Sequence, residues 1–180
     1  MDWGLWLPII LSIIAIFFGF FNFWWLHLRV GQLIVSKPFA YRIAKINDNG
    51  LLVEVPLSFY NTGATPITVE NIYLVINFQD TRIPLFFNAT RDSIEDNKQK
   101  TATQFVVDGK RYLMNVFSFQ VRDKPINVDI GKWDCELFGK LNSTKYKSLS
   151  KFTLDVKRLD QSAIARLNLD DEYRKLVDKP

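Results

Sequence analysis

The feature that most constrains this chain is an uncharged apolar stretch close to its N-terminus. Between Leu5 and Leu26 no residue is charged, and the only polar side chains are those of Ser12 and Asn22. A helix of this length spans about 33 Å, enough to cross the roughly 30 Å hydrocarbon core of a bilayer. Because lipid offers the backbone no hydrogen-bonding partner, such a segment must be helical. The sequence therefore predicts a transmembrane anchor over residues 1–28, with the lipid bilayer as its first partner.

The residues at the two ends of this stretch favour a permanent anchor. Tryptophans lie at both ends, where amphipathic rings prefer the membrane interface: Trp3, Trp6, Trp24 and Trp25. A cleavable signal peptide has a basic start and a cleavage site of small residues. This chain begins with Asp2 and no Lys or Arg, and the stretch ends in large residues. A signal peptide and a buried core helix are therefore the less favoured alternatives.

A stripe of small and polar residues runs along the predicted span. Its members are spaced by three, four and three positions, which places them on one helical face: Ser12, Ala15, Gly19 and Asn22. Small residues let helices approach closely, and an amide in lipid seeks a partner across the interface. The stripe predicts association with a second copy or with a protein partner. The alternative is that Ser12 bonds its own backbone and Asn22 reaches the headgroups.

The charges that flank the span indicate its orientation. All 23 Lys and Arg follow Leu28, and positive residues mark the cytoplasmic side of a span. The single Cys135 agrees, because oxidising compartments favour paired cysteines. We therefore predict a single-pass membrane protein with a cytoplasmic C-terminal domain. The juxtamembrane basic residues behind this prediction are Arg29, Lys37, Arg42 and Lys45.

These four cations have a second expected role. Near an anionic leaflet each contributes on the order of 1 kcal/mol, which would draw the base of the domain against the membrane. Two glycosylation sequons, at 88–90 and 142–144, leave the reversed topology open, since they matter only in a secretory lumen.

After the span, the sequence changes to short runs with period-two alternation. In residues 51–60, every second residue from Leu51 to Phe59 is apolar, and Pro56 suggests an edge or a bulge. Recurring turn signals separate eight candidate strands. We therefore expect a linker over 29–37 and a β-sandwich over 38–158. The alternative is a mixed α+β domain in which 91–101 is helical. The candidate strands are 38–46, 51–60, 67–79, 82–87, 102–107, 111–121, 126–137 and 149–157.

One stretch supports a more specific fold. Residues 55–69, VPLSFYNTGATPITV, resemble the strand–turn–strand unit of immunoglobulin-like sandwich domains, including membrane-tethered ones. The resemblance implies an all-β, Ig-like β-sandwich of about 7–8 strands. It implies no function, because folds of this type host many.

The last residues, 159–180, show a different period. Asp160 is a candidate N-cap, and lysines near the end suit the C-terminal dipole of a helix. The sequence predicts a short amphipathic helix, packed on the domain or docking a partner. Its apolar stripe comprises Ile164, Leu167, Tyr173, Leu176 and Val177.

Reactive side chains are scarce in the predicted domain. The only histidine is His27 at the membrane edge, and the only cysteine is Cys135, which excludes Ser-His-Asp and Cys-His sites and structural zinc. No phosphate-binding glycine motif is present. The acids Asp92, Glu95 and Asp96 resemble a calcium loop, but interleaved cations favour a solvated loop. We predict no enzyme activity, no cofactor and no metal.

The basic residues are too dispersed to indicate nucleic-acid binding. The nearest approach to a patch lies around Tyr146, and Phe152 is expected in the core rather than on a stacking surface. Its lysines are Lys140, Lys145, Lys147 and Lys151.

The sequence therefore predicts a non-enzymatic, membrane-anchored β domain that binds or scaffolds at the cytoplasmic surface. The alternatives are an accessory subunit recruited through the span, or an extracytoplasmic ligand-binding domain if the topology is reversed.

Overall fold

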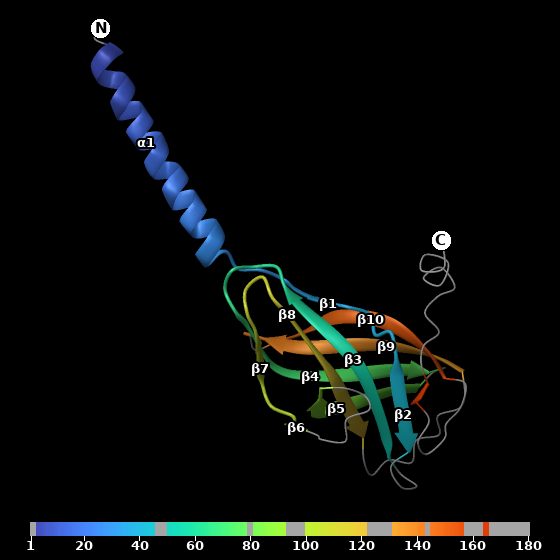
Figure 1. Cartoon of the computed structure of the whole chain (residues 1–180). Coiled ribbons are helices and arrows are strands. Elements are labelled where there is room, and N and C mark those ends of the chain that lie inside the picture. Colours follow the sequence, from blue (N-terminus) through green and yellow to red (C-terminus); the bar gives the residue numbers. More distant parts are fainter. Residues whose placement is uncertain are drawn as a thin grey trace, which may run out of the picture.

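The computed structural model describes residues 3–45, 50–78, 81–92, 100–121, 131–142, 145–156 and 164–165, with the backbone alone at 3–5, 45 and 164–165. A helix, α1 (Trp3–Phe23), continues into a π-helical turn, η1 (Trp24–Leu28). It projects from a β domain as an isolated rod (Figure 1). The segment Trp6–Leu28 is long and apolar enough to cross a membrane, and none of its most apolar window is buried.

Eleven strands lie within the described residues. They are β1 (Leu33–Val35), β2 (Tyr41–Lys45), β3 (Leu51–Asn61), β4 (Ile67–Phe78), β5 (Thr81–Arg91), β6 (Lys100–Thr101), β7 (Phe105–Val107), β8 (Tyr112–Val121), β9 (Gly131–Leu141), β10 (Tyr146–Val156) and β11 (Ile164–Ala165). The predicted mostly-β domain is confirmed. The candidate strands overlap β2 to β5 and β7 to β10, closely at β3, β4 and β8 and more loosely at β5 and β9. Strand β1 lies inside the predicted linker.

The strands form one continuous sheet rather than the two separate sheets of an Ig-like sandwich. The order is β10-β9-β4-β5-β8-β3-β2-β11, and each strand is antiparallel to its neighbours in this order. The long strand β5 pairs with β4 through its first half and with β8 through its second half, with a bulge between Phe87 and Ala89. Because a bulge increases local bend and twist, β5 carries the sheet around a corner. The expected two-sheet arrangement is thereby replaced by a nearly closed, barrel-like sheet.

The ends of the sheet approach one another. The Tyr41 hydroxyl on β2 donates a hydrogen bond to the backbone carbonyl of Asp155 on β10. Inside the curve lies an apolar core, built from the alternate residues that the sequence indicated on β3 and from the matching faces of the other strands. Its largest fully buried side chains include Trp133, Phe59, Phe117 and Phe119.

Pro56 lies within a central strand and not at the edge of the sheet. The Ser58 carbonyl accepts a hydrogen bond from the Ser36 N–H, and the Ser58 N–H donates to the Ser36 hydroxyl. The N–H and C=O groups at even positions of β3 therefore point toward β1 and β2. On that side β2 pairs with β3 only up to Glu54, and β1 begins pairing at Phe59. The missing N–H of Pro56 therefore falls in the gap between two partners, where it costs no ladder hydrogen bond.

The predicted C-terminal helix is not seen in the described residues. Ile164 and Ala165 form β11, which pairs with Arg42 and Tyr41 of β2. This pairing satisfies backbone groups that an edge strand would otherwise expose. The rest of 159–180 lies outside the described residues.

The Tyr41 bond provides a test of how the sheet closes. Burial, together with the negative charge of Asp155, raises the pKa of the Tyr41 hydroxyl above its usual value of 10.0. The Tyr41 hydroxyl therefore contributes fully to stability below its pKa in the unfolded chain. This contribution is lost as the pH rises through its pKa in the folded protein. We expect Tyr41→Phe to lower the free energy of unfolding by about 1 kcal/mol at pH 8. Urea titrations of the protein in detergent, followed by circular dichroism of the sheet, measure this.

The pH dependence supplies the control. The difference between wild type and Tyr41→Phe should shrink as the pH rises above 10, because only the wild type loses a bond. Equal stability of the two proteins at pH 8 would show that the bond contributes nothing to closure.

Candidate functional site

The chain passes from the helix to the β domain through a compact set of hydrogen bonds, which we call the junction (residues 29–32, 61–65 and 107–111). The π-helical turn ends where the Arg29 N–H donates to the Trp24 carbonyl at 3.0 Å, and the Arg29 guanidinium lies 4.1 Å from the Trp25 ring centroid. The Arg29 carbonyl accepts the Ala64 N–H at 2.8 Å. One residue beyond the span, the chain is therefore already bonded to the domain.

Asn61 connects the turns of the junction. Its side-chain amide donates to the carbonyls of Thr65 at 2.8 Å and Val107 at 3.0 Å, and its side-chain oxygen accepts the Gly63 N–H at 2.9 Å. The Gly63 carbonyl in turn accepts the Lys110 N–H at 2.8 Å. The Asn61–Gly63 turn, recognised in the sequence only as a turn, is the centre of this network.

Two glycine backbones touch in the junction. A Cβ on Gly31 would lie 1.8 Å from the Gly63 nitrogen, and a Cβ on Gly63 would lie 2.0 Å from the Gly31 nitrogen. Only residues without side chains allow this approach. Gly63 lies in the turn that the sequence identified, but its contact with Gly31 has no sequence signal, because the two are far apart in the chain.

The predicted self-association stripe lies on the exposed helix. The Ser12 hydroxyl donates to the Pro8 carbonyl at 2.8 Å, which is the alternative considered for this residue. Ala15, Gly19 and Asn22 are exposed, and a Cβ on Gly19 would meet nothing within 4 Å. Association through the stripe stays a prediction.

The four juxtamembrane basic residues are not brought together. Arg29 lies at the junction, whereas Lys37 is exposed between β1 and β2 and lines a pocket. Arg42 and Lys45 are on β2, which Figure 1 shows at the end of the domain away from α1. Only Arg29 of the four is bonded into the junction.

Arg42 instead belongs to a group of charges in the domain. Glu54, fully buried, accepts a hydrogen bond from the Ser118 hydroxyl at 2.9 Å and pairs with Arg91 at 2.9 Å and Arg42 at 3.6 Å. Glu54 occupies an even position of β3, on the face opposite the apolar core. Two cations compensate its buried carboxylate, as desolvated charges require.

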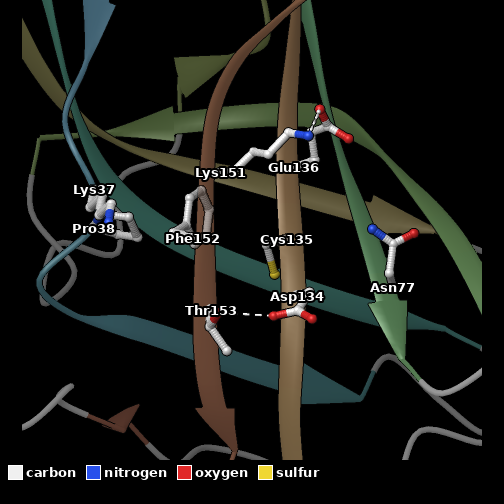
Figure 2. Close-up of a pocket in the computed structure, with 9 residues that line it drawn as sticks. All are labelled: Lys37, Pro38, Asn77, Asp134, Cys135, Glu136, Lys151, Phe152 and Thr153. Atoms are coloured by element: carbon white, nitrogen blue, oxygen red, sulfur yellow. Dashed lines mark hydrogen bonds and ion pairs between the residues drawn. The ribbon is translucent and has the colours of Figure 1, made fainter.

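A pocket of about 620 Å³, partly open to solvent, lies beside β9 and β10. Figure 2 shows Cys135 and Phe152, which are register partners on the two strands, between the Lys37–Pro38 segment and Asn77. The remaining lining residues are Asp134, Glu136, Lys151 and Thr153.

The polar groups of this pocket are bonded to one another. Asp134 accepts the Thr153 hydroxyl at 2.9 Å. The Ser148 hydroxyl, at 2.6 Å, and Lys151, at 3.2 Å, hold the pKa of Glu136 below its ordinary value. Burial and the neighbouring Asp134 raise the pKa of the Cys135 thiol to about 12, so it stays a protonated thiol at neutral pH.

No cluster of three metal-ligating side chains occurs among the described residues. The suggested calcium loop lies largely outside them. Its described member, Asp92, pairs with Lys100 at 2.8 Å. The lysines considered for nucleic acid are partly engaged, Lys140 with Glu70 at 2.7 Å and Lys151 with Glu136, and Phe152 is buried as expected.

Comparisons with known proteins place the chain in no family. No family model and no curated protein matches it. A solved protein from Archaeoglobus fulgidus shares 12% identity at a TM-score of 0.42, over 71% of this chain and 100% of that one. A Bacillus subtilis protein described as a lipoprotein shares 19% identity at 0.41, over 72% of this chain and 38% of that one. A family 123 glycoside hydrolase from Clostridium perfringens shares 9% identity at a TM-score of 0.37, over 73% of this chain and 28% of that one. At these scores the similarities do not extend to function.

The glycine contact gives a test of the junction. We expect Gly31→Ala to destabilise the β domain by about 1–3 kcal/mol, because the added methyl group meets backbone atoms that cannot move aside. Urea midpoints in detergent measure the effect. Gly19→Ala is the matched control, since a Cβ there has open space, and it should leave the midpoint unchanged. A Gly31→Ala variant as stable as wild type would show that the contact is loose.

Proposed function

We propose that this protein is a single-pass, membrane-anchored β domain that binds or scaffolds, without enzymatic activity, at the cytoplasmic surface. The observation that carries the proposal is the exposure of the apolar helix. Every described large apolar side chain from Trp6 to Leu28 is exposed to the surroundings of the domain. At about 25 cal/mol per Å² of apolar surface, leaving such a helix in water is unfavourable by on the order of 20 kcal/mol. A bilayer removes this cost.

The chemistry of the domain supports binding over catalysis. The carboxylates of the pocket beside β9 and β10 are paired with hydroxyls and a lysine. Its thiol is held protonated. Such a surface offers charge and hydrogen bonds to a partner but no activated nucleophile.

The two glycosylation sequons left the reversed topology open. The surroundings of their asparagines bear on that alternative. The Asn88 side-chain oxygen accepts a hydrogen bond from Gln120 at 2.6 Å in a half-buried position. The Asn142 side-chain oxygen accepts the Thr68 N–H at 3.0 Å. The half-buried Asn88 is an unfavourable site for a bulky glycan, whereas Asn142 is exposed.

The open face around Gly19 favours a second candidate, an accessory subunit recruited through the span. This face has the small residues that helix packing in lipid uses. Both candidates require the anchor, so the anchor is tested first.

Alkaline extraction tests the anchor. We expect the wild-type chain to stay with the membrane pellet after a carbonate wash, and a variant carrying Ile14→Arg and Phe17→Arg to be released, because each arginine at the bilayer centre costs about 3 kcal/mol. Phe86→Arg, at an exposed aromatic of the β domain, is the control and should stay in the pellet. Release of the wild-type chain would overturn the proposal.

Orientation needs a separate measurement. A C-terminal alkaline phosphatase fusion should be inactive and a C-terminal fluorescent-protein fusion bright, because the domain lies in the cytoplasm. An active phosphatase fusion would instead favour the extracytoplasmic alternative and leave the anchor intact.

A further inference from the structure

An exposed apolar row crosses the outer face of the sheet. Ile34 of β1 is in register with Tyr60 of β3, which is in register with Tyr112 of β8. Their exposed fractions are 54%, 41% and 74%. Met114 lies two residues beyond Tyr112, hence on the same face, and is also exposed. We call these four residues the apolar row.

The apolar row borders the junction. Tyr60 directly precedes Asn61, Tyr112 directly follows Arg111, and Ile34 lies two residues after Gln32. The Arg111 carbonyl accepts the Asn61 N–H at 3.0 Å, and the Gln32 carbonyl accepts the Thr62 N–H at 3.1 Å. Figure 1 shows the adjacent ends of β1, β3 and β8 next to the end of the helix. The row is therefore held within a few residues of the membrane boundary, without slack in the linker.

The exposed apolar side chains of β3 and β8 lie at the junction end of this face. Beyond Met114 and Ser58, the register partners Pro56 with Val116, and then Glu54 with Ser118, are buried.

Cations accompany the apolar row. Lys110 and Arg111 are exposed in the turn before β8, and Arg29 lies at the junction. The same turn also contains one acidic residue, Asp108, whose carboxylate lies 3.9 Å from the Arg111 guanidinium. Tyrosines and apolar side chains beside basic residues are the composition of surfaces that lie in an anionic interface. The sequence could not show this, because Lys110 and Arg111 are distant from the span along the chain.

We propose that the apolar row rests in the headgroup layer of the bilayer that holds the span, with Lys110 and Arg111 on anionic lipid. The inference rests on the proposed anchor and deepens it: the domain is not suspended in water but lies on the membrane in one fixed orientation. Ile34, Tyr60 and Tyr112 supply apolar contact, and the tyrosine hydroxyls remain hydrated among the headgroups.

Fluorescence quenching of the full-length protein in vesicles containing anionic lipid tests the inference. Single variants Tyr112→Cys and Phe86→Cys are labelled with an environment-sensitive thiol fluorophore. Phe86 is the matched control, because it is an aromatic of 60% exposure that lies opposite Gln120, at the end of β8 away from the junction. Cys135 is buried, and the unsubstituted chain measures any background labelling there. A headgroup-attached nitroxide lipid should quench the Tyr112→Cys label roughly twofold or more above the Phe86→Cys label.

A third label separates this inference from the anchor. Phe17→Cys should be quenched by nitroxide on the acyl chains, which reports that the span is in lipid. Quenching at position 17 with equal, weak quenching at 112 and 86 would overturn the apolar row as a lipid contact while leaving the anchor in place. Absence of quenching at position 17 would overturn both.

Charge reversal tests the lipid chemistry. Adding Lys110→Glu and Arg111→Glu to the Tyr112→Cys variant should reduce the quenching at position 112 in anionic vesicles and change it little in phosphatidylcholine vesicles. Equal quenching with and without the charge reversal in anionic vesicles would contradict the role given to these cations.

Discussion

The arrangement of this molecule depends on the contact between two backbones, those of Gly31 and Gly63, beside the bond from Ala64 to the Arg29 carbonyl. Together they leave almost no free chain between the helix and the sheet. A flexible linker would let the domain sample many orientations, whereas this junction permits few. The position of every surface of the domain relative to the span follows from these few backbone atoms.

The interior of the domain combines an apolar core with one compensated charge. Glu54 is buried on the outer side of β3 and is bonded to groups from three other strands, β2, β5 and β8. Hydrogen bonds and ion pairs are directional, whereas apolar contacts are not. The contacts of Glu54 therefore require these strands to keep one relative register. The group includes Arg91, in the half of β5 that pairs with β8.

Much of the local structure could be predicted from the sequence, because it depends on neighbours in the chain. The alternation from Leu51 to Phe59 identified the inner face of β3, and the turn after Asn61 separated β3 from β4. The closure of the sheet could not be predicted, since it depends on β5 dividing its pairing and on Tyr41 reaching Asp155. The resemblance of residues 55–69 to a sandwich motif covers one strand–turn–strand unit, which occurs equally well in a continuous sheet. The helical period of the tail was misleading at Ile164. There, pairing with the free edge of β2 outweighs the local preference of the sequence for a helix. The junction also escaped prediction, because its partners are brought together only by the completed fold.

The pairing of β11 with β2 has a consequence for crowding. Without it, β2 would offer an unpaired backbone edge, and such edges template the growth of sheets from one molecule to the next. Proteins confined to a two-dimensional layer meet in restricted orientations and at high local density, which favours growth of this kind. Under the proposed anchoring, Ile164 and Ala165 of the tail would block such growth at the part of this edge formed by Tyr41 and Arg42.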